Sequence, residues 1–600
     1  MRWRIPLILL GLSALAPLVA VSGTGCFPAA GIGVEPPTYS FYYPVGLAVS
    51  RGGNVLYAVN SDFDLQWNGG TIQSLDLHLI RRHTLLAIKD PTDPNLPLAL
   101  PPDPSASCPA APVVTATGDA GAALGWACAP PTNASYYMRD SVVIGAFATD
   151  LQRSRLETPC VSDPTKTCSR LFSPTRGDAS LTWADVVVDD PNVAPGVADT
   201  SSEYAPFKLH CGASSEREVA GGSCDTGHHA GNDPNQPGDT RLITMPGEPF
   251  GMAQSMDGQS IVITHQTDTK SSLFSTYTPL PGQATTPPAL QFVLDGLPTG
   301  GIAVAAIPHD PQAYPECLAD PTSGACKAAV PRPAFLQTSL AAAEVSLLRY
   351  YSDQGDQGVS APFRPFLQNE ANVALTVNAG ATDFARGIAI DATPRIFCKA
   401  HVPPADSTAV PPRTQADVDA DIMACARLPA RVFIASRSGP TLIIGSLGAE
   451  TSPDGSYDAD QLHLQQTVPL PNGPSGVYLA PVVDRAGNYA LRVFVVCFDA
   501  SQIIVFDPDT NQIESVLRVG LGPFALTFDP FDMNDVALNK PVPFDSRDAD
   551  LSLRRYRFAY VASFTQSYVQ VVDLDNGSPD KSTYGTVVFT LGMPTNPKGT

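Results

Sequence analysis

Pro44-Val-Gly-Leu-Ala-Val-Ser50 begins the segment from which the fold can be inferred. Gly53-Asn-Val-Leu-Tyr-Ala-Val-Asn60 and Gly70-Thr-Ile-Gln-Ser-Leu-Asp-Leu77 follow it. Each part is rich in β-branched and other apolar residues, and glycines stand in the turns between the parts. This pattern is typical of strands in an antiparallel β-meander.

The same phrase returns along the chain. Clear copies begin at Pro249-Phe-Gly-Met-Ala-Gln-Ser255, Pro474-Ser-Gly-Val-Tyr-Leu479 and Gly522-Pro-Phe-Ala-Leu-Thr-Phe528, and weaker copies begin at Val143, Thr299 and Arg386. We therefore expect seven units, which start near residues 44, 143, 249, 298, 386, 474 and 522. Recurrence of a four-strand unit is the signature of a β-propeller.

The repeated phrase resembles the YVTN-type β-propeller repeat. The shared elements are Pro-x-Gly-x-Ala-x-Ser, Asp-Gly, Leu-Tyr-Val-x-Asn and Val-x-x-Ile-Asp, and the resemblance covers most of residues 40–592. It implies an all-β fold, a seven-bladed propeller of four-stranded antiparallel blades. It says little about activity, since the family includes binding proteins, surface-layer proteins and a few enzymes. A β-sandwich, two smaller β-domains, and six or eight blades remain alternatives.

Composition restricts the partners. The 600 residues include 37 Lys and Arg against 58 Asp and Glu, a formal net charge of -21. Nucleic-acid binding needs a basic surface, and adhesion to anionic lipid needs a basic patch, so we expect neither. Hydrophobic residues make up 44% of the chain, which is enough to build a sizeable core.

The N-terminus has the pattern of an export signal. A basic segment, Met1-Arg-Trp-Arg4, precedes an apolar run from Ile5 to Val21, and small residues then lead to Cys26. Thr24-Gly25-Cys26 resembles a bacterial lipobox, although Gly23 stands where that motif usually has Leu. We predict a signal peptide over residues 1–25, lipid attachment at Cys26 and an outer-membrane or surface location. The alternatives are an uncleaved anchor and a plain Cys26 thiol.

The predicted boundaries follow from these two signals. A lipid-anchor linker over residues 26–40 leads to the propeller with its insertions over residues 41–592, and a tail follows over residues 593–600. We expect contact with the membrane through the lipid anchor only.

The cysteines support export. Besides Cys26, and Cys497 inside an apolar run, ten remain, and they fall into five sequence-adjacent pairs: Cys108/Cys128, Cys160/Cys168, Cys211/Cys224, Cys317/Cys326 and Cys398/Cys425. Local disulfides are the simplest interpretation, each stabilising its loop by about 2.5–3.5 kcal/mol. No CxxC occurs and the spacings match no ligand pattern, so we predict no metal and no cofactor.

Long insertions separate the expected strands, because blades of about 40–45 residues fill much less chain than residues 44–592. Successive strands of a blade are antiparallel, so the connections between its first and second and its third and fourth strands share one face. That assignment puts five insertions on one face: 152–169, 190–240, 308–332, 394–430 and 529–554. We expect 90–138, between the first two units, on the opposite face.

The insertion pattern favours a non-catalytic envelope lipoprotein that binds or scaffolds a protein or glycan partner through the insert-bearing face. The alternative is a propeller enzyme, a lactonase-like hydrolase or a quinoprotein-like dehydrogenase, with its site in the axial channel. Glu248, Asp383 and Arg386 precede or begin innermost strands and are candidates for the channel mouth. A structural coat component is a third possibility. The chain contains no GxSxG, HExxH, P-loop or dinucleotide fingerprint, which favours a non-catalytic role without deciding the question.

Two histidine positions invite a metal interpretation. His228-His229 lies in a polar loop near Asp233, and His265 lies on an apolar strand. We expect the His pair to be solvated and His265 to be a hydrogen-bonded core residue, because isolated histidines seldom complete a metal site.

Overall fold

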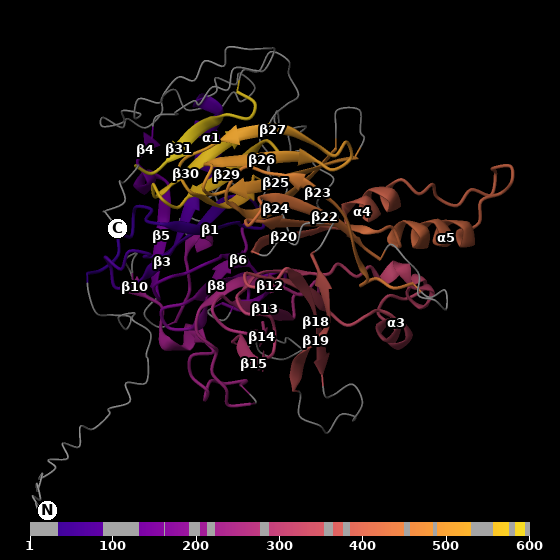
Figure 1. Cartoon of the computed structure of the whole chain (residues 1–600), viewed down its shortest axis with the longest axis horizontal. Coiled ribbons are helices and arrows are strands. Elements are labelled where there is room, and N and C mark those ends of the chain that lie inside the picture. The colour runs from indigo at the N-terminus through magenta and orange to yellow at the C-terminus, as the bar shows by residue number, and fades with distance from the viewer. Residues whose placement is uncertain are drawn as a thin grey trace, which may run out of the picture.

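Strands dominate the protein in the computed structural model shown in Figure 1. The structure describes residues 34–87, 131–160, 163–190, 205–212, 222–239, 241–276, 287–352, 364–375, 384–448, 457–483, 489–529, 556–574 and 583–593. The predicted signal peptide, Cys26, Cys108, Cys128 and Asp383 lie outside these residues, as do most of 90–138 and 529–554.

The described strands form seven sheets, and in each of them four strands come from one continuous segment of the chain. The first two blades each carry one extra short strand. Blade 1 contains β1 (Pro44–Val49), β2 (Val55–Asn60), β3 (Gly70–Asp76) and β5 (Met138–Ile144), with β10 (Gly222–Ser223) beside β5. Blade 2 contains β6 (Gln152–Arg153), β8 (Thr167–Thr175), β9 (Ser180–Val187) and β11 (His229–Ala230), with β7 (Thr158–Pro159) beside β8.

Blades 3 to 5 have four strands each. Blade 3 contains β12 (Pro249–Gln254), β13 (Ser260–His265), β14 (Ser271–Ser275) and β15 (Ala289–Leu294). Blade 4 contains β16 (Gly301–Ala306), β17 (Ala334–Ser339), β18 (Glu344–Ser352) and β19 (Pro365–Ala374). Blade 5 contains β20 (Ala385–Asp391), β21 (Ala430–Ser436), β22 (Thr441–Leu447) and β23 (Leu462–Pro469).

Blades 6 and 7 complete the fold. Blade 6 contains β24 (Pro474–Val483), β25 (Tyr489–Cys497), β26 (Gln502–Asp507) and β27 (Gln512–Arg518). Blade 7 contains β28 (Pro523–Phe528), β29 (Phe558–Ser563), β30 (Tyr568–Asp573) and β31 (Val587–Leu591), with β4 (Pro131–Thr132) beside β31. The predicted seven-bladed propeller of four-stranded antiparallel blades is confirmed.

The helices lie in the insertions. They are α1 (Leu77–Ala87), α2 (Pro315–Leu318), α3 (Gly324–Ala329), α4 (Thr393–Ala400) and α5 (Gln415–Ala426), with short 3-10 turns over Ala134–Tyr136, Ala205–Phe207, Thr226–His228 and Pro311–Ala313. Among the described residues, no helix has the length and apolar character that crossing a bilayer requires.

The hydrophobic core lies between neighbouring blades. Strands such as β2 and β29 are buried along their whole length because both faces of each inner strand are covered. In the cluster shared by blades 1 and 7, Leu56 packs with Tyr560 and Phe589. Apolar residues on both faces explain why these strands are nearly continuous hydrophobic runs rather than alternating ones.

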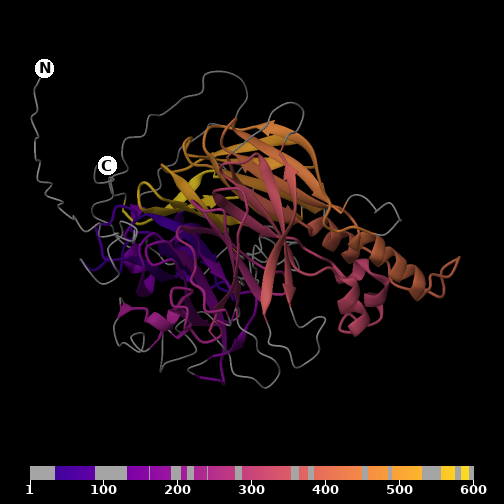
Figure 2. The same cartoon turned by 60° about the horizontal axis from the view of Figure 1, so that its bottom comes forward.

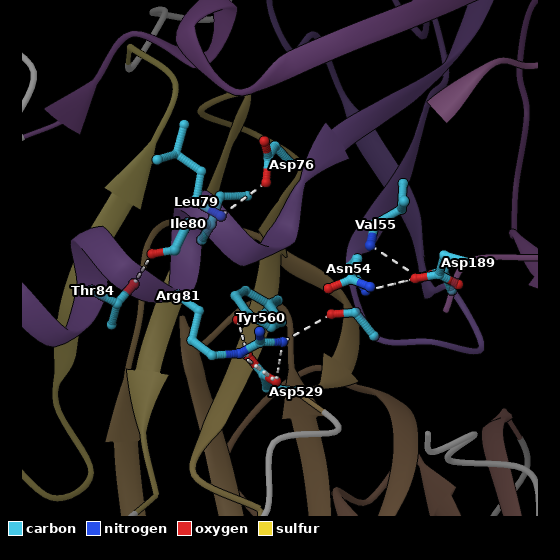
Figure 3. Close-up of polar contacts among 12 residues, drawn as sticks. Asn54, Val55, Asp76, Leu79, Ile80, Arg81, Thr84, Asp189, Asp529 and Tyr560 are labelled. Atoms are coloured by element: carbon cyan, nitrogen blue, oxygen red, sulfur yellow. Dashed lines mark hydrogen bonds and ion pairs between the residues drawn. The ribbon is translucent and has the colours of Figure 1, made fainter. Parts of the chain in front are cut away.

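The ring closes between blades 1 and 7, whose innermost strands β1 and β28 are in contact. Figure 1 shows yellow β31 of blade 7 beside the early strand β4, which pairs with it in parallel. On the insert side, Arg81 of α1 binds Asp529 directly after β28 (Figure 3). In the same view, the backbone N–H of Asn54 in blade 1 donates to the carboxylate of Asp189, which follows β9 of blade 2. Blade 1 is therefore bound to blade 7 on one side and to blade 2 on the other.

One sequence-based boundary and one assignment of an insertion to a face were wrong. The unit expected to start at Val143 does not start there, because Met138–Ile144 is the outermost strand of blade 1 and pairs with β3. Blade 2 begins instead at the two-residue strand β6, which is too short to show a strand pattern in the sequence. As a result, the 90–138 insertion joins the third and fourth strands of blade 1. By antiparallel alternation, the strand ends that it joins, at Asp76 and Met138, lie on the same face as the strand ends that flank the other five insertions, not on the opposite one.

Candidate functional site

The innermost strands of the seven blades enclose an axial cavity of about 360 Å³. This size is within the range of about 300–1,000 Å³ that is usual for small-molecule sites. The wall is mostly aliphatic, and its larger apolar members include Leu47, Ile302, Ile388, Val477 and Leu526.

A β-bulge at the start of the innermost strand recurs in six blades. The pairing with the second strand shifts directly after the first residue of β1, β12, β16, β20, β24 and β28. A bulge leaves a residue outside the ladder and re-aims its side chain. The residues placed there all line the cavity: Val45, Phe250, Ile302, Arg386, Ser475 and Phe524. We call these six residues the bulge ring.

Small residues follow the bulge where neighbouring strands approach the axis. A Cβ on Gly251 would lie 2.1 Å from the carbonyl oxygen of Ile302, and one on Gly387 would lie 3.0 Å from the Cα of Gly476. Glycine therefore allows the backbones of adjacent blades to come close at these points. This is the physical basis of the glycine in the repeated Pro-x-Gly phrase, in which x is the member of the bulge ring.

A second ring precedes the first. In every blade, the residue just before the innermost strand or its equivalent segment has a left-handed backbone: Tyr43, Phe147, Glu248, Gly300, Phe384, Gly473 and Gly522. Glycine adopts this conformation without strain, whereas Tyr43, Phe147, Glu248 and Phe384 have φ values of 48°, 59°, 55° and 73°. Four blades therefore keep a large side chain at a position that favours glycine, and such strain often accompanies binding sites.

Aromatic rings gather beside this end of the channel. Phe564 lies 5.0 Å from Tyr43, 5.2 Å from Phe63 and 5.7 Å from Phe524, measured between ring centroids. Phe63 lies 5.8 Å from Phe147 and is 47% exposed. The rings come from the connections of blades 1, 2 and 7 on the face opposite the insertions. Together they form an aromatic collar of partly exposed π-surface beside the bulge ring.

Arg386 is the charged member of the bulge ring. Its guanidinium lies 5.3 Å from the centre of the Phe384 ring, and its Nε is buried with no hydrogen-bond partner among the described residues. Burial lowers the pKa of Arg386, the Arg437 cation lowers it further, and the Asp499 carboxylate opposes both effects. Asp499 is itself bound to Arg437, with 2.6 Å between the Arg437 nitrogen and the carboxylate.

The other charged groups of the cavity wall have protein partners. Asp391 accepts hydrogen bonds from Arg431 and from the Thr393 backbone, at 3.0 and 2.9 Å. Asp150 binds the Gln152 side chain, and Arg153 donates to the Ser154 carbonyl oxygen. These groups stabilise the wall. Arg155 also lines the cavity and interacts with the protein, so Arg386 is the described cation of the wall whose guanidinium has no hydrogen bond or ion pair.

The predicted channel-mouth residues separate in the structure. Arg386 lines the cavity. Glu248 is one of the left-handed residues that precede the innermost strands, and it forms an ion pair with Arg176 in the turn between β8 and β9 of blade 2. Asp383 lies outside the described residues. Apart from Arg386, the members of the bulge ring were missed at the sequence level, although the variable residue of each Pro-x-Gly phrase was a signal for them.

On the insert face, two insertions form one unit, which we call the helical projection (residues 308–332 and 393–429). Figures 1 and 2 show α4 and α5 extending together away from the sheets. Lys399 of α4 binds Asp310 at 2.8 Å, and Arg427 donates to the carbonyl oxygen of Ala313 at 2.8 Å. These contacts join the insertion of blade 4 to that of blade 5.

Disulfides staple this face. Four of the five predicted cysteine pairs lie at disulfide distance: Cys160–Cys168, Cys211–Cys224, Cys317–Cys326 and Cys398–Cys425. The last two belong to the helical projection. Disulfides persist in oxidising compartments, so these pairs indicate a protein outside the cytoplasm. Cys497 is buried as a free thiol, and burial raises its pKa to about 12.

The histidines have structural partners. His265 is fully buried, with Nδ1 2.9 Å from the Gly247 carbonyl oxygen and Nε2 2.8 Å from Ser272 Oγ. His228 binds Asp225 at 2.7 Å, while His229 binds Asp178 at 2.5 Å, so the two rings serve different carboxylates and are not simply solvated as expected. In the described part of the chain, no three metal-ligating side chains come together.

Among known proteins, similarity is found to solved structures but not to any protein family. The sequence matches no protein family, and it matches no curated protein. The structure is similar to hydrazine synthase of Kuenenia stuttgartiensis at 9% identity and a TM-score of 0.38, over 91% of this chain and 99% of that one. It is similar to the periplasmic gluconolactonase of Pseudomonas aeruginosa at 12% identity and a TM-score of 0.36, over 73% and 86%. It is also similar to a Lactobacillus plantarum protein at 11% identity and a TM-score of 0.36, over 82% of this chain and 88% of that one.

Proposed function

We propose that this chain is an exported, non-catalytic binding protein of the bacterial cell envelope, anchored by a lipid on Cys26. Its helical projection docks a partner, and the observation that carries this proposal is the fusion of two disulfide-bridged insertions into one rigid unit. A preorganised surface loses little conformational entropy on binding. Because the strand ends that flank all six insertions share one face, that face is the one where the chain is longest.

A protein with a basic surface is the partner that fits the projection best. Its exposed acidic side chains include Glu316, Asp320, Asp406, Asp417 and Asp421. Hydrogen bonds from Thr322, Thr408 and Thr414 lower the pKa of Asp320, Asp406 and Asp417, so these groups stay charged in mildly acidic surroundings. Complementary charge steers association and makes it sensitive to salt. A cell-wall glycan is the other class of partner.

Affinity capture from native envelope tests the docking. The tagged mature protein is cross-linked beside a Cys317→Ser/Cys326→Ser variant, with Cys160→Ser/Cys168→Ser as the matched control, since that disulfide lies on the same face outside the projection. We expect one stoichiometric protein that is lost from the first variant and kept by the control. Equal recovery from all three proteins contradicts docking on the projection, and recovery of peptidoglycan fragments would make the partner a glycan.

A point substitution refines the assignment. Ala420 is exposed on α5, so Ala420→Arg adds bulk and positive charge without disturbing the core. Gln259 is exposed in the turn between β12 and β13, on the same face of the propeller. Gln259→Arg is the matched control. The first change is expected to weaken capture at least tenfold, and the second to leave it unchanged.

Catalysis in the channel is the alternative function, and the axial cavity is the observation that supports it. A lactonase-like hydrolase needs a group that activates water near the reacting carbonyl. Asp150 and Asp391, the carboxylates of the described wall, are both engaged by the protein. Hydrolysis of a lactone series by the purified protein, lost on Asp150→Asn, would replace the docking proposal with this one.

A further inference from the structure

We propose that the axial cavity binds a small organic monocarboxylate with an apolar body, its carboxylate on the Arg386 guanidinium and its apolar part among the aliphatic side chains of the channel. This site is separate from the helical projection, since Arg386 begins β20 on the face opposite the insertions.

The charge of the site calls for an anion. A half-buried guanidinium without its own counter-charge is unfavourable, and an incoming carboxylate reduces that penalty while forming a two-point hydrogen bond. The fully buried arginines differ from Arg386, because Arg81 and Arg170 each have an aspartate, at 2.9 and 2.7 Å. The acidic group that acts on Arg386 is Asp499, which Arg437 already binds.

The number of charges favours a monoanion. Arg153, Arg155 and Arg386 line the cavity together with Asp150 and Asp391, so the charged groups of the described wall sum to a single positive charge. A phosphate dianion would exceed this net charge and would meet repulsion from Asp150. A carboxylate with one charge matches the planar guanidinium fork.

The uncharged part of the cavity wall favours a ligand whose remaining part is apolar. In the bulge ring, Val45, Phe250, Ile302 and Phe524 surround the axis with apolar groups, and Ser475 is the neutral polar exception. Behind them lie Leu47, Ile388, Val477 and Leu526. Apolar walls of this kind favour hydrocarbon over water. Phe384 packs against the guanidinium and limits its directions, so it acts as a positioning residue.

Isothermal titration calorimetry with octanoate tests the site, and octanamide and octylamine serve as probes of equal length. Octanoate is expected to bind, octanamide at least tenfold more weakly, and octylamine not at all. Arg386→Gln should weaken octanoate at least tenfold and leave octanamide unchanged. Arg241→Gln, an arginine before β12 that does not line the cavity, is the matched control and should bind octanoate like the parent protein.

Three results would overturn the proposal: no octanoate binding to the parent protein, equal affinity for octanoate and octanamide, or unchanged octanoate affinity in Arg386→Gln. Ala389→Phe, which fills the cavity from β20, should abolish binding of both octanoate and octanamide. Circular dichroism of each variant shows that it is folded. Loss of octanoate binding leaves the docking proposal untouched, because that proposal is tested by capture on the other face.

Discussion

Arg81 and Asp529 form a salt bridge of 2.9 Å in which neither side chain has any exposed surface, although 448 positions separate them in the sequence. Arg81 also donates to the Gly53 carbonyl oxygen, and Tyr560 donates to the Asp529 carboxylate at 2.5 Å (Figure 3). The pair ties the helix after the third strand of blade 1 to the innermost strand of blade 7. It therefore closes the ring on the insert side.

Arg81→Met is expected to destabilise the protein by about 3–5 kcal/mol, because it leaves the Asp529 carboxylate buried without a counter-charge. Urea unfolding measures the change. In Arg81→Met/Asp529→Leu, both charges are gone, and we expect much of that loss to be recovered. A double variant as unstable as the single one would show that the pair contributes more than charge compensation.

Stability should fall on acidification between about pH 6.5 and pH 4 because of His265. Burial lowers the pKa of His265 to about 4, against 6.5 for the unperturbed side chain. In that window the unfolded chain takes up a proton that the folded chain excludes. The contribution of His265 is therefore complete above pH 6.5 and shrinks by about 3 kcal/mol as the pH approaches 4.

Urea unfolding of His265→Gln across this range checks the assignment. The variant should have a flatter dependence of unfolding free energy on pH than the parent protein. His401→Gln, at an exposed histidine, is the control and should keep the parent slope. Identical slopes for all three proteins would exclude His265 as the source.

Phe384→Gly should be more stable than Phe384→Ala by about 1 kcal/mol, because residue 384 has φ 73° and a Cβ is strained there. Both variants lose the ring, so their difference isolates the backbone. At Gln259, which is outside the left-handed residues, the same pair should show the reverse order. The measurement is urea unfolding, and an alanine variant at least as stable as the glycine one would contradict strain at residue 384.

Removing the Cys398–Cys425 disulfide should destabilise the protein more than removing Cys160–Cys168. The two bridges span 27 and 8 positions, and loop closure predicts losses of about 3.6 and 2.5 kcal/mol. Paired serine substitutions and urea unfolding test the order. Limited proteolysis should cut first between α4 and α5 in the Cys398→Ser/Cys425→Ser variant, and resistance equal to the parent would argue against a staple.

Much of the fold was readable from the repeated phrase, since each copy is a local strand-turn-strand pattern. The boundary between blades 1 and 2 was not, because β6 has two residues and a long insertion hides the last strand of blade 1. The bulge ring was only partly visible. Arg386 was singled out by its charge, whereas its five partners in the ring are ordinary residues that gain meaning from their shared position.

Features that depend on near neighbours could be inferred from the repeated phrases: the strands and turns, the sequence-adjacent cysteine pairs, and the glycines that let innermost strands approach. Features that need distant segments side by side became visible in the folded protein. These are the Arg81–Asp529 closure, the union of two insertions in the helical projection, and a cavity around one unpartnered arginine. The physical reason is that burial and charge pairing depend on the arrangement of all seven blades, which no single repeat contains.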